Sequence, residues 1–133
     1  MTNIGYAAFE FCKSFTNIII PDSVKIIGRS AFHGCERLTS IVIPDSVESI
    51  GNMTFGFCTS LISITIPDSV IYIGDLAFSY CTSLTGITIP DSVRIIGNRA
   101  FFYCNKLKTA SVSAHFMGKT DDIFLEQTEI TYR

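Results

Sequence analysis

The sequence is poor in charged residues and carries almost no excess of either sign. Among its 133 residues only 17% are charged, and the formal net charge is −2. A chain with so little positive charge offers no electrostatic attraction to nucleic acid or to an acidic membrane surface. The 47% of apolar residues argues against disorder and predicts one domain with a substantial core.

Long apolar runs are also missing. Pro, Asp, Gly or Lys interrupts each apolar stretch before it reaches the length of a membrane span. The N-terminal segment 1–5 has neither a basic start nor an apolar signal core. Two hypotheses for localisation follow. The protein is secreted or on the cell surface if the chain is part of a longer protein, and cytoplasmic if Met1 is its native start.

The sequence offers no recognisable catalytic constellation. Its two histidines, His33 and His115, stand in no repeated relation to a nucleophile or to each other. The serines fall in predicted turns, and a Ser-His-Asp or Cys-His arrangement therefore lacks its parts. We expect a protein that is not an enzyme and holds no cofactor, with His33 on the solvated surface.

What the sequence does have is a repeat of 23 residues, kept without insertion or deletion from residue 4 to residue 112. Register this strict predicts coils that stack in a solenoid, each unit in the same place as the last. The repeated columns are Pro21, Pro44, Pro67 and Pro90; Gly5, Gly28, Gly51, Gly74 and Gly97; Cys12, Cys35, Cys58, Cys81 and Cys104; Phe9, Phe32, Phe55, Phe78 and Phe101; and Val24, Val47, Val70 and Val93.

One unit, residues 38–60, shows what each part predicts. Pro44 and Asp45 predict a turn in which the carboxylate bonds a nearby backbone N–H, and residues 47–50 a second extended stretch. Gly51 marks a corner that favours positive φ. Phe55 and Cys58, three residues apart, predict a short α or 3₁₀ turn. Alternating residues predict short strands that form one parallel sheet, at about 17–20, 40–43, 63–66, 86–89 and 109–112.

The repeated motif IPDSVxxIGxxAFxxCxxLxxI resembles the BspA-like leucine-rich repeat, over residues 4–112. The resemblance implies an α/β right-handed solenoid with one parallel sheet face, and short helical turns and extended segments on its other faces. It also implies the adhesive, non-catalytic roles found among bacterial surface proteins of this type. Phe15, Thr54 and Ala110 depart from the pattern, where the family has Leu, Ala and Ile.

The cysteine and aspartate columns predict neither disulfides nor a metal site. Five cysteines are an odd number, and parallel stacking keeps their Cβ atoms about 5 Å apart, so we expect reduced, buried thiols. A one-dimensional ladder also diverges where zinc ligands must converge. The aspartates lack the dense oxygen ligands of a calcium site, and we expect turn capping at Asp22, Asp45, Asp68 and Asp91.

The last residues keep the coil pitch while losing half of the core. Counting onward by 23 places Phe116 in the valine column, Phe124 in the phenylalanine column and Ile130 in the leucine column. Lys119 and Gln127 stand where isoleucine and cysteine stood. We therefore divide the chain into five tandem repeats over 1–112, the first partial, and a degenerate sixth coil over 113–133 that acts as a C-terminal cap.

Two outward surfaces are candidates for binding a partner. The sheet face is expected to be flat and nearly uncharged, with candidate residues Ser40, Val42, Ser63, Thr65 and Thr88. The opposite face carries an aromatic column that begins at Phe11 and is broken by Gly34, with candidate residues Phe57, Tyr80 and Tyr103. Aromatic rings are favoured interface anchors. The alternative is that these rings pack between coils and shield the core.

These observations predict a non-catalytic protein-binding module, as a fragment of a cell-surface adhesin that binds host or extracellular matrix proteins. The alternative is an intracellular scaffolding repeat that self-associates. A homo-oligomer could form through the first coil, because Ile4, Phe9 and Cys12 need a neighbour on their outer side. No nucleic acid partner and no membrane span is expected.

Overall fold

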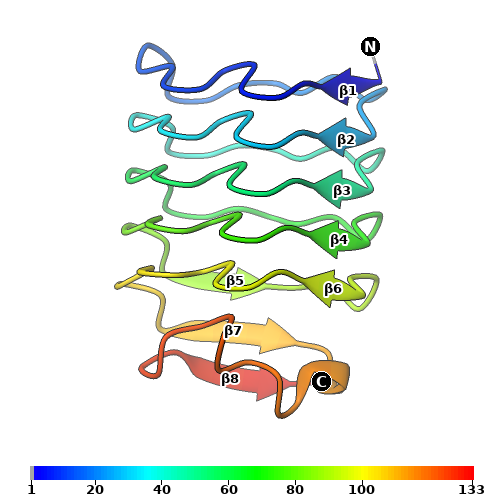
Figure 1. Ribbon diagram of the computed structural model, residues 1–133, viewed down its shortest axis with the longest axis vertical. Helices are drawn as coiled ribbons and strands as arrows, with labels where there is room; N and C mark the ends of the chain where they lie inside the picture. Colours follow the sequence, from blue (N-terminus) through cyan, green and yellow to red (C-terminus); the bar gives the residue numbers. More distant parts are fainter. Residues whose placement is uncertain (1) are drawn as a thin grey trace.

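The structure, a computed structural model, describes residues 2–133 as a stack of flattened coils. Each coil crosses the molecule along one broad side, turns, and returns along the other (Figure 1). The two chain ends lie at opposite ends of the stack. The predicted solenoid of parallel strands is therefore confirmed.

Parallel strands pair along both broad sides of the coils, so the structure has two sheets where the sequence predicted one. The larger sheet has the order β1-β2-β3-β4-β6, and each strand pairs 23 residues further along the chain, as Asn3 does with Ile26. Its strands are β1 (Asn3–Ile4), β2 (Ile26–Ile27), β3 (Ser49–Ile50), β4 (Tyr72–Ile73) and β6 (Ile95–Ile96).

The smaller sheet lies on the side where the sequence predicted strands, with the order β5-β7-β8. Further toward the N-terminus, only the bridges Ile19–Val42 and Val42–Thr65 continue it among residues 2–133. Proline ends the extended stretch in the first four coils, and its missing N–H cannot join a ladder. Ser113 takes the proline position after β7, and the regular strands on this side are β5 (Gly86–Thr88), β7 (Thr109–Val112) and β8 (Glu129–Tyr132).

The short helical turns that the spacing predicted are not confirmed. In the described part of the chain the one helix is the 3₁₀ turn η1 (Ala114–Phe116), far too short to cross a membrane. The segment from Gly28 to Cys35 instead alternates its hydrogen bonds. The N–H of Ala31 bonds back to Gly28 at 3.2 Å, whereas that of Phe32 reaches Thr54 on the next coil at 2.9 Å. Stacking, rather than local helix geometry, therefore satisfies this backbone.

The phenylalanine column forms the centre of the core. From Phe9 to Phe124 each ring stacks on the next, with centroids 5.1–5.5 Å apart and interplanar angles of at most 16°. The four middle rings are completely buried: Phe32, Phe55, Phe78 and Phe101. Because each ring stacks on the ring of the neighbouring coil, contacts between adjacent coils build this part of the core.

From Gly28 onward the glycine column is required by packing and not by the positive φ that the sequence predicted. Among the described glycines only Gly34 and Gly118 have positive φ. A Cβ on Gly51 would lie 2.8 Å from the backbone nitrogen of Arg29 and 2.9 Å from the carbonyl carbon of Gly28. The N–H of Gly51 also bonds the carbonyl of Ile27 at 2.8 Å. The backbones of adjacent coils touch at this corner, which leaves no room for a side chain.

The cysteine column follows the phenylalanine column and is buried from the second coil onward. All five thiols are free, and Cys12 alone is only half-buried. The Sγ of Cys58 donates to the carbonyl of Phe32 in the preceding coil at 3.2 Å, and the same bond recurs at Cys35, Cys81 and Cys104. Burial away from water raises the pKa of these four thiols, that of Cys35 to about 11 and that of Cys104 to about 12.

Replacement of Cys58 by serine is expected to destabilise the protein by about 1–3 kcal/mol at neutral pH, because it buries a hydroxyl in an apolar site. Burial raises the pKa of the Cys58 thiol in the folded protein, so this thiol ionises in the unfolded chain first as the pH rises. The stabilisation from the neutral thiol is therefore fully present below pH about 9 and is lost above it. At pH about 10.5 the difference in free energy of unfolding between the wild type and Cys58→Ser should therefore be about 2 kcal/mol smaller than at neutral pH. Urea unfolding at both pH values measures this difference, and Cys12→Ser, at the half-buried cysteine of the column, is the control. A gap that stays constant would contradict this linkage.

The C-terminal segment packs onto the fifth coil. Phe116 and Phe124 are buried, and β8 pairs in parallel with β7. Ile130 pairs with Ala110, so its predicted place in the leucine column is wrong: this coil is 20 residues from strand to strand instead of 23. Thr128 is buried at the end of the shortened turn, where its hydroxyl donates to Leu107 at 2.9 Å. That the segment acts as a cap stays a prediction.

Candidate functional site

The sheet-face candidates lie together along the side of the coils that carries β5, β7 and β8. Ser40, Val42, Ser63, Thr65 and Thr88 are all exposed. Along the stack, Val42 pairs with Ile19 on one side and with Thr65 on the other, and Thr88 pairs with Ser111. The column through Val42 therefore changes from apolar near the N-terminus to hydroxylic near the C-terminus, whereas the neighbouring column is already polar at Ser40.

The hydroxylic half of this side is hollowed into an open groove of about 620 Å³. Thr65, Thr88 and Ser111 line it together with Asp68 and Asp91. A smaller depression of about 360 Å³ lies over the apolar half, between the first two coils. Its exposed apolar side chains are those of Ile19 and Val42, which are 90% and 77% exposed, and the exposed polar residues Asn17, Asp22 and Ser40 line it as well. We call the larger hollow the hydroxyl groove.

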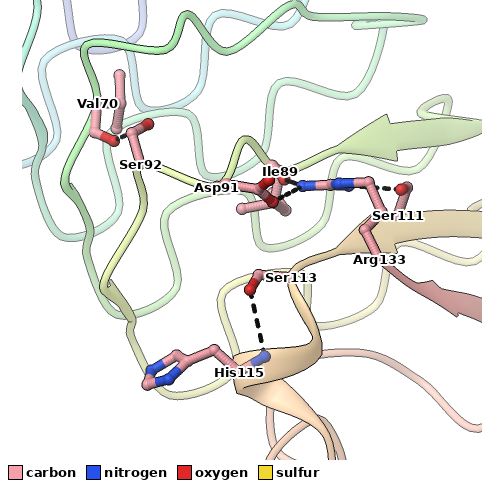
Figure 2. Close-up of polar contacts among 8 residues, drawn as sticks. All are labelled: Val70, Ile89, Asp91, Ser92, Ser111, Ser113, His115 and Arg133. Atoms are coloured by element: carbon pink, nitrogen blue, oxygen red, sulfur yellow. Dashed lines mark hydrogen bonds and ion pairs between the residues drawn. The ribbon is translucent and has the colours of Figure 1, made fainter.

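A guanidinium group from the chain itself, that of Arg133, lines the hydroxyl groove, and Figure 2 shows its polar contacts. Arg133 follows β8, and its N–H bonds the carbonyl of Val112 at 2.9 Å, which fixes where the side chain starts. Its guanidinium donates to the Asp91 carboxylate at 2.7 Å, to the carbonyl of Ile89 and to the hydroxyl of Ser111. Sequence reasoning missed Arg133, because the shortened last coil breaks the count of 23 that identified the other columns.

The aromatic candidates lie on the other broad side, so the structure does not bring them together with the groove. Phe57 stacks on Tyr80 with centroids 4.3 Å apart, and Tyr80 stacks on Tyr103 at 5.0 Å. Phe57 and Tyr103 are 41% and 45% exposed. All three have positive φ, which is costly for bulky residues at about 1–2 kcal/mol each. Ring stacking between coils offsets part of that cost.

His33 corrects the sequence-based interpretation of this column. We expected it on the solvated surface, but its side chain is only 14% exposed and neither ring nitrogen has a hydrogen-bond partner within residues 2–133. The imidazole packs edge-on against Phe11 and Phe57, at 5.5 Å from each. It thus links the rings of Phe11 and Phe57 across the coil that has Gly34 in this column, and its Nδ1 lies 3.8 Å from a Glu10 carboxylate oxygen.

The stacked rings of Phe57, Tyr80 and Tyr103 turn their faces toward one another. A planar ligand that needs a free ring face would find few here. This arrangement favours the shielding role over the anchoring role for Phe57, Tyr80 and Tyr103. The residues described contain no group of three His, Cys, Asp or Glu that could hold a metal ion.

A parallel solenoid with a 23-residue pitch, an apolar ladder inside and an open sheet side defines a repeat protein of the leucine-rich type. The chain belongs to the BspA-type leucine-rich repeat family: the family model, described as a BspA type leucine rich repeat region, matches residues 2–131 in six copies. Leucine-rich repeat proteins are generally protein-interaction modules, and the fold is typically non-enzymatic. No curated protein matches the chain.

Solved structures of bacterial leucine-rich repeat proteins share this fold. A leucine rich repeat protein from T. pallidum is 31% identical, with a TM-score of 0.86 over 99% of this chain and 63% of its own. One from Bacteroides ovatus is 37% identical, with a TM-score of 0.73 over 84% and 35%. A leucine rich cell surface protein from Faecalibacterium prausnitzii is 32% identical, with a TM-score of 0.69 over 84% and 33%. The chain thus spans about one to two thirds of these relatives.

Proposed function

We propose that the chain is a protein-binding module that engages its partner through the sheet side. The observation that carries this is the combination of an exposed apolar patch, Ile19 and Val42, with the adjoining hydroxyl groove. Apolar side chains exposed to this extent gain free energy when a partner covers them, and the hydroxyls give directional contacts. The parallel bridges and strands hold both the patch and the groove on a rigid ladder, so little conformational entropy is lost on binding.

The partner we propose is a host or extracellular matrix protein, and the module is part of a cell-surface adhesin. One similar structure is described as a cell surface protein, which supports this location by analogy. The chain spans only part of each relative, and adhesion would then be a property of the longer protein. The low net charge of −2 is consistent with a contact made by shape and hydrogen bonds instead of long-range attraction.

Introduction of lysine at Val42 is expected to weaken binding to a matrix protein by about tenfold, because it places a charge in the centre of the apolar patch. The measurement is biolayer interferometry of the immobilised chain against purified collagen, fibronectin and laminin. Ile71→Lys, at a 48% exposed position outside both hollows of the sheet side, is the matched control. Equal loss in the two variants, or none in either, would contradict sheet-side binding.

A second candidate function is scaffolding through self-association of the first coil. The observation that favours it is the incomplete burial of Phe9, Cys12 and Phe15, whose equivalents in later coils are fully buried. We expect the chain's apparent mass in light scattering to rise with concentration. Phe15→Ser should reduce this rise, because it removes apolar surface from that end. A monomer at every concentration would contradict this candidate and leave the adhesin proposal intact.

A further inference from the structure

The rim of the sheet side carries one exposed carboxylate per coil, and we call this set the aspartate row: Asp22, Asp45, Asp68 and Asp91. The sequence predicted that they cap turns. In the structure the turn is closed by its backbone, as the N–H of Val47 bonds the carbonyl of Pro44 at 3.1 Å, and no described backbone N–H bonds a carboxylate of the row. Of the four carboxylates of the aspartate row, that of Asp91 alone forms an ion pair within residues 2–133. The other three carboxylates point to solvent unneutralised.

The fourth member of the row shows what such a carboxylate binds. The Arg133 guanidinium contacts Asp91 and the Ile89 carbonyl from one coil and the Ser111 hydroxyl from the next (Figure 2). A planar guanidinium has donors on three sides, so it can reach a carboxylate, a carbonyl and a hydroxyl at once. The acceptors are therefore a guanidinium site built across two stacked coils. Arg133 supplies the occupant from outside the repeat.

The same three acceptors recur at the step of 23 residues. One coil earlier they are the Ile66 carbonyl, the Asp68 carboxylate and the Thr88 hydroxyl, and all three residues line the hydroxyl groove beside Arg133. Two coils earlier the set is Ile43, Asp45 and Thr65. In the first coil Val42 replaces the hydroxyl, so the series ends there. Two copies of the occupied site thus remain open.

We propose that this sheet side binds arginine side chains of an extended segment of a protein partner, one in the hydroxyl groove at the Asp68–Thr88 site and one beside the groove at the Asp45–Thr65 site. The proposal rests on the function proposed above and specifies the chemistry of the partner. Neighbouring sites follow the coil spacing of about 4.8 Å, whereas alternate side chains of an extended peptide start about 6.6 Å apart. Long, flexible arginine side chains can absorb that difference.

The test uses a fluorescein-labelled peptide that alternates glycine and arginine, with matched peptides carrying lysine or citrulline in place of arginine. Fluorescence anisotropy at low salt measures binding to the full chain. The arginine peptide should bind most tightly, because only its side chain has both the charge and the planar set of donors. The lysine peptide should bind more weakly, and the citrulline peptide should not bind. Equal binding of the arginine and lysine peptides would overturn the proposed site.

Substitutions in the groove should act in opposite directions. Asp68→Asn should weaken arginine-peptide binding by about twofold to fivefold, as expected for loss of one exposed ion pair. Arg133→Ala should tighten binding by a similar factor, because it vacates the Asp91 site. Glu36→Gln and Arg37→Ala change the charge equally at positions outside the groove and should have little effect. If each control changes the affinity for the arginine peptide as much as its groove variant does, the attraction depends on net charge alone and the proposal fails.

The outcomes separate this inference from the function on which it rests. Matrix-protein binding that is lost in Val42→Lys but unchanged in Asp68→Asn would keep the proposed function and overturn the arginine sites. Arginine-peptide binding with the expected variant pattern, but no binding to any matrix protein, would support the sites and overturn the adhesin proposal.

Discussion

Truncation after Val112 is expected to lower the melting temperature by about 10 °C or more and to cause aggregation. The deletion removes Phe116 and Phe124, both buried, and with them the last ring of the phenylalanine stack. It also uncovers the fifth coil, whose Phe101 and Val112 would then face water. Calorimetry gives the melting temperature, and light scattering gives the aggregation.

A point substitution distinguishes a cap from a merely ordered tail. Phe124→Ala keeps the length of the chain but removes the ring that stacks on Phe101 at 5.1 Å, and about 3–5 kcal/mol should be lost. Met117→Ala, at a 62% exposed side chain in the same segment, is the matched control. If the truncated protein melts and behaves in solution like the full chain, residues 113–133 are not a cap.

Alanine at Gly51 is expected to cost about 3 kcal/mol, at the upper end of what overpacking typically costs. The new methyl group would lie 2.8 Å from the backbone of the preceding coil, and a backbone cannot rotate away as a side chain can. The same substitution at Gly5 meets no atom within 4 Å and should be nearly neutral. The two glycines hold the same position in the repeat, so denaturant unfolding of the pair isolates the contact between coils. An equal loss of free energy of unfolding at Gly51 and Gly5 would show that these glycines act only through the conformational entropy of the unfolded chain.

Repetition made most of the architecture predictable. Columns of Phe, Cys and Val at one fixed step can be buried together only if the coils stack in register, and the buried Phe55, Cys58 and Val47 confirm this. The predicted helical turn failed because spacing by three residues is common to 3₁₀ turns and to successive β-turns. Ser30 and Met53 have positive φ in those turns, although neither residue type favours it. The fit between coils imposes that conformation, and it cannot be read from one unit alone.

The candidate site was predictable only in part, for a related reason. Thr65 and Thr88 are exposed because strand alternation turns them outward, and a period of two shows that directly. His33 stands outside every strand, and its imidazole lies over Gly56 of the next coil, where an added Cβ would be 2.8 Å from its Cδ2. Arg133 lies in the one coil that is three residues short, where position in the repeat no longer tells which side chains are neighbours. Local departures from the repeat therefore carried the information that counting missed.

The ladder of stacked phenylalanines also determines how the molecule would respond to a pulling force. Each coil is held only by the coils on either side, so tension along the stack would detach the end coil first and then the next. Every detached coil adds 23 residues of extended chain, about 75 Å, in place of a coil spacing of about 4.8 Å. A module joined to a longer chain would in this way lengthen stepwise under load, and the coils still stacked would keep their binding side intact.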